Sequence, residues 1–232
     1  MKSLFIALIT TLPLAAFCQK PNTLTKEEKK EGWQLLFDGK NTDGWHTYGQ
    51  TSGSPRWKVE DGAITPNTAD KGHGDLLTDK VYGNFDLKLQ WKISHGGNSG
   101  ILFDVQEDTA KYKETYFTGP EMQVLDNDSN HDGRIHKHRA GNLYDLIAGP
   151  DETKPVGQWN DAEIILKDGN LKLFLNGVNV VTTTMWNDQW RDMVAHSKFK
   201  RWPDFSLAHN GRIALQYHDF PVWFRNIRIK TL

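Results

Sequence analysis

The sequence contains a single cysteine, no hydrophobic run long enough to span a membrane and almost no excess charge. Cys18 has no partner for an intrachain disulfide, so a hydrophobic core must hold the fold together. The longest apolar run, residues 4–17, is shorter than the roughly 20 residues that span a bilayer. The 28 basic and 29 acidic residues nearly balance, which gives no reason to expect nucleic acid or an anionic membrane surface as a partner.

Three familiar catalytic fingerprints are also missing. The chain has no Gly-x-Ser-x-Gly nucleophile elbow, no phosphate-binding glycine loop and no dinucleotide-binding pattern. Serine hydrolase, nucleoside triphosphatase and nicotinamide-dependent chemistry are therefore unsupported, and we expect no nucleotide cofactor.

The N-terminal segment has the layout of a secretory signal. Lys2 precedes the apolar run, and Ala16 and Cys18 fit the small-residue pattern for cleavage after position 18. We therefore predict that residues 1–18 are removed and that the protein is exported, to the periplasm in the simplest case. The mature chain would then contain no transmembrane helix.

A lipid anchor on Cys18 is the alternative to simple cleavage, and the bulky Phe17 directly before it argues against this alternative. Residues 19–31 are polar and rich in Lys and Glu, which predicts a solvated lead-in with one short helical turn. The folded domain is then expected over residues 32–232.

Alternating apolar and polar residues predict β-strands along most of this domain. Every second side chain of residues 85–93 is large and apolar, as in a strand with one buried face. Asp168-Gly169 and Asn176-Gly177 favour tight turns and predict a three-stranded meander. Its strands are expected at residues 164–167, 171–175 and 178–182, and two later strands are expected at residues 213–218 and 227–230.

Helical patterning is confined to residues 186–197. Many short strands joined by Gly, Asn and Asp turns, with no βαβ spacing, predict an all-β fold. The expected architecture is an antiparallel jelly-roll sandwich of two sheets packed face to face.

Polar side chains gather in residues 116–145, which we take as the candidate site. Residues 121–125 should form a strand, with Glu121 and Gln123 on one face and Met122 and Val124 on the other. A strand with a purely structural role would rarely place so many hydrogen-bonding side chains together.

Glu121, Gln123 and the following Asp126 have three interpretations. They could be a solvated strand edge. They could be a glycosidase pair, in which one carboxylic acid protonates the leaving oxygen and a second carboxylate attacks or activates water. A β-bulge would then have to bring Glu121 and Asp126 to one face. Alternatively, Glu121 and Gln123 could hold a divalent metal or a keto sugar together with a nearby histidine.

Other positions suit sugar binding. Arg139 lies beside the turn residue Gly141 and could clamp substrate oxygens, or could pair with Asp145. The glycines of residues 96–100 allow close backbone approach to a ligand. Gln216 and His218 should share one face of a late strand, and His218 could act as a general base because imidazole ionises near neutral pH.

Nine tryptophans are many for this length. Most large aromatic residues belong to the cores of β-sandwiches, but an aromatic face can also stack on a sugar ring. Four tryptophans adjoin turn residues and are the better candidates for a sugar platform: Trp45, Trp57, Trp159 and Trp202.

Several blocks of the chain resemble, in order, the 3-keto-disaccharide hydrolase domain family. The resemblance covers about residues 30–232 and implies a two-sheet jelly roll similar to concanavalin A-like lectins and glucanases. The matching blocks are GWQLLFDG (32–39), GW (44–45), WKVEDG (57–62), GNSGI (97–101), EMQVLD (121–126), HRAGNLYD (138–145), GQWN (157–160), LNG (175–177) and WFRNI (223–227).

The resemblance implies a sugar substrate already oxidised at C3 by a partner, a sugar 3-dehydrogenase. A 3-keto group acidifies the C2 proton, so a base can remove that proton and the glycosidic oxygen can leave from C1 by β-elimination. Hydration of the resulting enone completes a net hydrolysis. This route needs a base and an enolate stabiliser, either a divalent metal ion or donors such as Arg139.

The resemblance also implies roles for the site residues. Glu121, Gln123 and His138 would hold the sugar or a divalent metal. The base would be Asp126 or His218, and with Glu121 these residues form the expected catalytic set.

The expected binding set positions the keto and hydroxyl oxygens of the sugar. Asn98, Arg139 and Tyr144 are implied by the matching blocks. Gln216 and Trp159 complete the predicted set.

Two positions depart from the family pattern. Tyr217 stands where an acidic residue would precede His218, and Gln158 stands where a Glu would precede the Trp-Asn pair. Two alternative functions remain: an ordinary glycosidase of glucanase-like fold and a non-catalytic carbohydrate-binding module.

Overall fold

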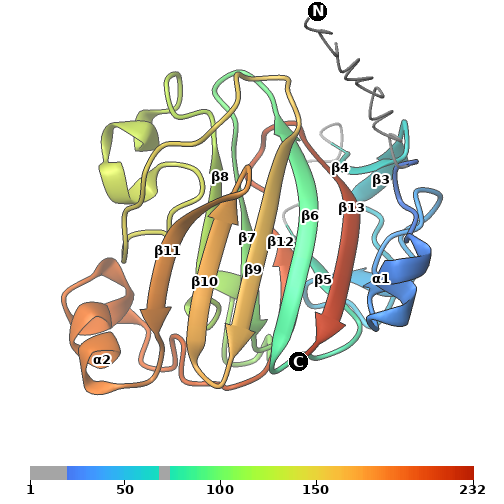
Figure 1. Ribbon diagram of the computed structural model, residues 1–232. Coiled ribbons are helices and arrows are strands. Elements are labelled where there is room, and N and C mark those ends of the chain that lie inside the picture. The colour runs from blue at the N-terminus through green and yellow to red at the C-terminus, as the bar shows by residue number, and fades with distance from the viewer. Residues whose placement is uncertain (1–19, 68–73) are drawn as a thin grey trace, which may run out of the picture.

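The fold is an all-β sandwich, seen here in a computed structural model that describes residues 20–67 and 74–232 (Figure 1). The expected signal segment, residues 1–18, lies outside the described residues. Two antiparallel sheets pack face to face, as the alternating pattern predicts. Among the helices that the structure describes, none is both long and apolar enough to cross a membrane.

The larger sheet has eight strands within the described residues. Its order is β11-β10-β9-β6-β13-β4-β3, and β1 pairs with β13. The strands are β1 (Gln34–Leu35), β3 (Trp57–Glu60), β4 (Ala63–Pro66), β6 (Phe85–Ile93), β9 (Asn160–Lys167), β10 (Asn170–Leu175), β11 (Val178–Thr184) and β13 (Val222–Thr231).

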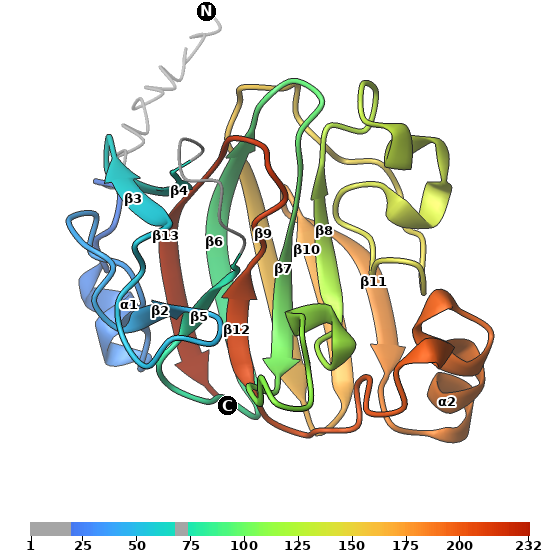
Figure 2. The same ribbon diagram turned by 180° about the vertical axis from the view of Figure 1, so that it is seen from behind.

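The smaller sheet has five strands in the part of the chain that is described, in the order β2-β5-β12-β7-β8. Figure 2 shows this sheet from its outer side. Its strands are β2 (Trp45–Thr47), β5 (Leu76–Thr78), β7 (Asn98–Val105), β8 (Glu121–Leu125) and β12 (Arg212–Leu215).

Helices are short and peripheral. The capping box of Thr25 and Glu28 starts the first α-helix, and the Asn187 side chain caps the second by accepting from the Trp190 N–H. Both helical predictions are confirmed. The helices are α1 (Lys26–Lys30), η1 (Thr115–Phe117), η2 (His131–Arg134), η3 (His136–His138), α2 (Asp188–Ala195) and η4 (Lys198–Arg201).

The meander is confirmed, and its turns explain why it forms. Asp168 and Gly169 have φ angles of 48° and 79°, and Asn176 and Gly177 have 51° and 84°. Two consecutive positive φ angles define the tight hairpin turn that matches strand twist. The late strand differs from its expected extent: β12 ends at Leu215, so Gln216 and His218 lie beyond it rather than within it.

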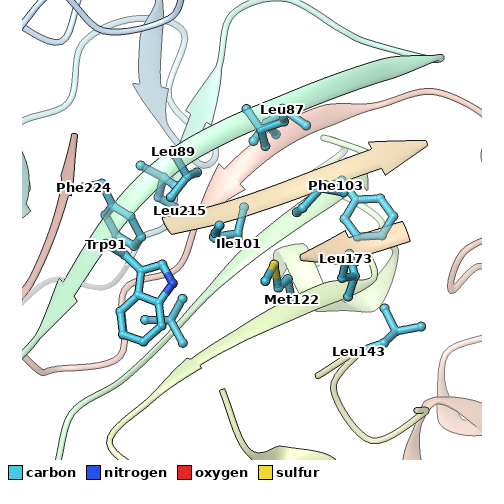
Figure 3. Packing of buried hydrophobic residues seen from close by; sticks show 14 of the residues in the cluster. Leu87, Leu89, Trp91, Ile101, Phe103, Met122, Leu143, Leu173, Leu215 and Phe224 are labelled. Carbon is cyan, nitrogen blue, oxygen red and sulfur yellow. The ribbon is translucent and has the colours of Figure 1, made fainter. Parts of the chain in front are cut away.

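The core lies between the two sheets. Alternate residues of β6, among them Leu87, Leu89 and Trp91, point toward Ile101 and Met122 of the smaller sheet (Figure 3). Each such large side chain contributes about 1.5–3 kcal/mol when fully buried. Because Met122 fills this core, its neighbours along β8 must point to the outer face of the smaller sheet.

Strand register fixes which side chains share that outer face. Leu77 of β5 pairs with Ala214 of β12, Ala214 pairs with Leu102 of β7, and Leu102 pairs with Glu121 of β8. Directly paired residues lie on the same side of a sheet. The outer face therefore carries one continuous row from β5 to β8, ending at Glu121.

Candidate functional site

A cleft of about 400 Å³ lies on the outer face of the smaller sheet, over β7, β8 and the end of β12. Strand residues form its floor, and loops around η1, η2 and η4 form its walls. Its lining residues are Asn98, Tyr116, Glu121, Gln123, Asp132, Tyr144, Lys198, Phe199, Arg201, Trp202, Gln216 and His218. Six residues of the predicted catalytic and binding sets thus meet in one place: Asn98, Glu121, Gln123, Tyr144, Gln216 and His218.

Glu121 is the buried acid of this cleft. Burial raises the pKa of its carboxyl to about 8, the charges of Asp75 and Asp132 add to this rise, and Lys198 opposes it. Within residues 20–67 and 74–232, no group donates a hydrogen bond to this carboxyl. Glu121 is therefore protonated at neutral pH and free to give its proton to a ligand.

The backbone beneath Glu121 has room for its carboxyl because residue 100 is glycine. Gly100 lies in the neighbouring strand, and a Cβ placed on it would lie 2.0 Å from Oε1 of Glu121. This close approach explains why residue 100, the last glycine of the Gly-rich residues 96–100, has no side chain.

Lys198 is a candidate functional residue that the sequence alone does not reveal. Its Nζ lies 3.9 Å from the centroid of the Tyr144 ring. Burial lowers the pKa of Lys198, and Glu121, Asp145 and Asp132 oppose this shift. A partly buried ammonium group beside a protonated acid is a typical arrangement for stabilising developing negative charge.

Tyr144 is held by a network behind the cleft wall. Its hydroxyl donates to Asp132 at 3.0 Å, and its ring stacks on His138 at a centroid distance of 4.3 Å. The backbone N–H of Lys198 donates to Asp145 at 2.8 Å. The network therefore fixes both Tyr144 and the loop that carries Lys198.

His138 does not line the cleft, so the structure does not support its predicted direct role in binding. Its Nε2 lies 3.0 Å from Asp145 and its Nδ1 lies 3.4 Å from Asp132. With both ring nitrogens directed at carboxylates, His138 positions Tyr144 instead.

The predicted metal set therefore does not fit the geometry. Glu121 and Gln123 both reach the cleft, but the third expected ligand, His138, uses its nitrogens elsewhere. No group of three or more His, Cys, Asp or Glu in the described part of the chain is arranged to hold a metal ion. We derive no step through a metal, and a metal requirement stays a prediction from the family resemblance.

Amide groups form the floor of the cleft. The Gln123 side chain donates to Asn98 at 3.3 Å and accepts the N–H of Val124 at 3.1 Å. Ser99 anchors the backbone carbonyl of Gln216 at 2.8 Å. Amide donors and acceptors held in this way can bind sugar hydroxyls.

Asp126 does not face the cleft, which removes the geometric basis for its predicted role as base. β7 and β8 pair in continuous register from Leu102 with Glu121 to Asn98 with Leu125, so the bulge that would turn Asp126 toward the cleft is not formed. Its carboxylate instead accepts hydrogen bonds from three backbone N–H groups. These are the N–H of Gly96, at 2.7 Å, and those of Asp128 and Ser129. Asp126 therefore holds a turn.

Arg139 and Trp159 also lie outside the cleft. Arg139 pairs with Asp151 at 3.0 Å rather than with Asp145. Trp159 lies on the outer face of the larger sheet, with the Arg225 guanidinium 3.9 Å from its ring. Neither residue occupies the position that its predicted role in substrate binding requires.

Among the four candidate platform tryptophans, Trp202 lines the cleft. Trp45 and Trp57 are buried in the core. Trp202 packs edge to face with Tyr116, with ring centroids 5.3 Å apart, and stacks on Phe117 at 5.1 Å. Tyr116 and Trp202 make one wall of the cleft aromatic, as expected for a site that contacts the apolar face of a sugar ring.

The fold and the cleft together define a β-sandwich of the carbohydrate-active class. Residues 32–230 match the 3-keto-alpha-glucoside-1,2-lyase-like domain, and the chain belongs to this family. The family resemblance and the two-sheet jelly-roll prediction are thus confirmed.

Two similar proteins agree with this assignment, and a third agrees with the fold. A relative from Bacteroides thetaiotaomicron named 3-keto-disaccharide hydrolase is 39% identical, over 87% of this chain and 79% of its own. The crystal structure of a candidate glycosyl hydrolase from Parabacteroides distasonis has a TM-score of 0.83 and 34% identity, covering 92% of this chain and 100% of that one. The Bacillus subtilis carbohydrate-binding module CBM66 has a TM-score of 0.52 and 15% identity, covering 81% and 96%, and shows the fold alone.

Proposed function

We propose that this protein cleaves the glycosidic bond of 3-keto sugars, with 3-keto-disaccharides as the substrate class. The family and the relative named 3-keto-disaccharide hydrolase support this activity. The observation that carries the proposal is the pairing of Glu121, whose pKa burial raises to about 8, with the partly buried Lys198 in one cleft. A protonated acid and a cation are the two groups that an elimination from a keto sugar needs besides a base.

The reaction begins with loss of the C2 proton to a base. His218 takes this role because it is exposed at the mouth of the cleft and can exchange protons with water. The electron pair left at C2 moves into the carbonyl and forms an enolate whose negative charge lies on the C3 oxygen. Lys198 stabilises that oxygen as it becomes anionic.

Collapse of the enolate expels the glycosidic oxygen from C1. Glu121 gives its proton to this oxygen, so the leaving group departs as a neutral alcohol. Water then adds to C1 of the enone and a proton returns to C2, which yields the free 3-keto sugar. In the net reaction one glycosidic bond is broken and one water molecule is consumed, which is a hydrolysis.

The floor and walls of the cleft position the ring for this sequence. Asn98, Gln123 and Gln216 offer amide groups to the hydroxyls, and Trp202 offers an aromatic face. The Tyr144 ring, which lines the same cleft, packs against the Lys198 ammonium group and keeps it in place. Holding the reacting groups in line reduces the entropic part of the barrier.

The proposal also requires an enzyme that oxidises the sugar at C3 before this protein acts. We infer such a sugar 3-dehydrogenase as the pathway partner from the chemistry of the substrate. Export of the protein, guided by residues 1–18, would place cleavage outside the cytoplasm.

The proposal is tested by incubating the purified protein with a glucoside and the matching 3-keto-glucoside, each with and without a chelator. We expect release of the leaving group from the keto substrate only. Glu121→Gln should lower kcat by about 10²–10⁴, since it removes the acid. Turnover of the unmodified glucoside, or binding of both sugars without turnover, would contradict the proposal and favour an ordinary glycosidase or a binding module respectively.

A further inference from the structure

A second hollow, of about 340 Å³, lies beside the cleft. Thr115 lines this hollow, and the next residue of η1, Tyr116, lines the cleft, so one turn of chain separates the two spaces. Tyr48, Asp75, Tyr112 and Glu114 form much of the rest of its lining.

The hollow opens on the same face of the smaller sheet as the cleft. Asp75 precedes β5 and, by alternation, points to the same side as Leu77. Leu77 belongs to the row of paired residues that ends at Glu121. Tyr48 and Tyr116 pack against that row, so aromatic rings cover the sheet between the two spaces.

Asp75 is the distinctive group in this hollow. Its carboxylate accepts a hydrogen bond from the Thr115 hydroxyl and another from the Tyr217 N–H at 2.8 Å. No lysine, arginine or histidine among the described residues forms an ion pair with it. Burial raises the pKa of Asp75 to about 6, so the group is ionised at neutral pH despite its surroundings.

The Asp75 carboxylate and the Glu121 carboxyl are electrostatic neighbours. The charge of Asp75 contributes to the raised pKa of both Glu121 and Tyr116. Because Tyr116 lines the cleft and Thr115 lines the hollow, a ligand that extends from Glu121 past Tyr116 enters the hollow that Asp75 lines.

A partly buried carboxylate without a cation is costly to the fold, because only a hydroxyl and an N–H replace the hydration it loses. Such groups gather at sites that bind ligands. The remaining acceptor capacity of Asp75 suits hydroxyl groups, and the exposed Glu114 on the rim adds a second negative charge. Lys113, also exposed on the rim, is the cation among the lining residues.

We propose that this hollow binds the leaving group of the substrate, and that Asp75 makes it select an uncharged, hydroxyl-bearing sugar over one that carries a carboxylate, phosphate or sulfate. The inference rests on the proposed function, because a leaving group exists only if a glycosidic bond is cleaved. Asp75 accepts hydrogen bonds from hydroxyls of the departing sugar and repels anionic ones, strongly so in a poorly hydrated site.

The test compares Asp75→Asn with the unaltered protein on three 3-keto-glucosides. Their leaving groups are methanol, glucose and glucuronic acid. Asn keeps the shape of the side chain: its amide oxygen can still accept the Tyr217 N–H, and its amide nitrogen can donate to the Thr115 hydroxyl. Asp86→Asn is the matched control, because burial likewise raises the pKa of Asp86 to about 6, but Asp86 lies on the larger sheet.

We expect the unaltered protein to prefer the glucose leaving group to the glucuronic acid one. Asp75→Asn should lower kcat/KM for the glucose substrate about 10- to 100-fold more than for the methyl substrate, the worth of hydrogen bonds to a charged group. It should also reduce the preference for glucose over glucuronic acid. The control should change neither ratio.

Several outcomes would overturn the inference. If Asp75→Asn lowers kcat/KM equally for all three substrates, or for none, the hollow does not bind the leaving group. Inhibition by free glucose and free glucuronic acid gives a second measurement on the same variants, and equal inhibition by both would count against the inference. If the unaltered protein cleaves none of the three substrates, the proposed function itself fails, and the inference fails with it.

Discussion

Gly100 and Glu121 share a space that only glycine leaves open. A Cβ on residue 100 would lie 2.0 Å from Oε1 of Glu121 and 2.6 Å from its Cδ. The position of the Glu121 carboxyl therefore depends on a residue that has no side chain.

Gly100→Ala should displace the Glu121 carboxyl and leave the fold intact, because the flexible end of that side chain can move aside. We expect kcat on a 3-keto-glucoside to fall about 100-fold, since a shift of about 1 Å in a reacting group can have that effect. Gly83→Ala is the control, because the nearest atom to its added Cβ lies 3.5 Å away, at an ordinary contact distance. Full activity of Gly100→Ala would show that the position of Glu121 is not needed.

Glu121 should make the stability of the protein depend on pH. Its folded pKa, about 8, lies above its ordinary 4.5, so its stabilising contribution is complete below about pH 4.5 and is lost as the pH rises through 8. Glu121→Gln has no such loss, so its stability relative to the unaltered protein should increase between pH 4.5 and 8. Urea unfolding of both proteins at pH 4, 7 and 9 measures this difference, and a difference that does not vary with pH would contradict the raised pKa.

Lys198→Met should remove the cation but keep the packing of the side chain against Tyr144. We expect kcat to fall by about 100-fold or more, as when a group that stabilises a developing oxyanion is lost. Lys200→Met is the matched control, because Lys200 is exposed in the same short helix. Equal activity of the two variants would exclude Lys198 from the chemistry.

Asp126→Asn should affect stability rather than catalysis. Burial alone would raise the pKa of Asp126, but hydrogen bonds from Gly96, Ser129 and Asp128 lower it below its ordinary 3.8. Its stabilising contribution is therefore present above about pH 4 and is lost as the pH falls through the folded value.

Thermal unfolding at pH 7 should accordingly show a less stable Asp126→Asn protein, with the deficit shrinking below pH 4. Its kcat at a temperature well below unfolding should remain near that of the unaltered protein. Asp128→Asn, at an exposed position of the same turn, serves as the control. A large loss of kcat in Asp126→Asn with normal stability would restore Asp126 as the base.

The strands and one part of the site could be predicted because their signals are local. Alternation along β8 places Met122 in the core and Glu121 and Gln123 on the outer face, and the Asp-Gly and Asn-Gly turns define the meander. These features depend only on neighbours within a few residues.

The rest of the site depends on contacts between distant parts of the chain. Lys198 follows a helix in a basic segment that carries no recognisable motif. It is brought to the cleft by the hydrogen bond from its backbone N–H to Asp145 and by the packing of its side chain on Tyr144. Asp126 and Arg139 carry the right chemistry for a site, but turn geometry directs them to backbone N–H groups and to Asp151. No spacing in the sequence distinguishes these outcomes.

The most direct test of the elimination route follows the atom at C2. A 3-keto-glucoside carrying deuterium at C2 is cleaved in ordinary water under single-turnover conditions, and the deuterium left in the first-formed sugar is measured by mass spectrometry against an enzyme-free sample held for the same time. We predict that each cleaved bond is accompanied by loss of deuterium to solvent beyond that background. Cleavage with deuterium fully retained at C2 would mean direct displacement at C1 and would contradict the account.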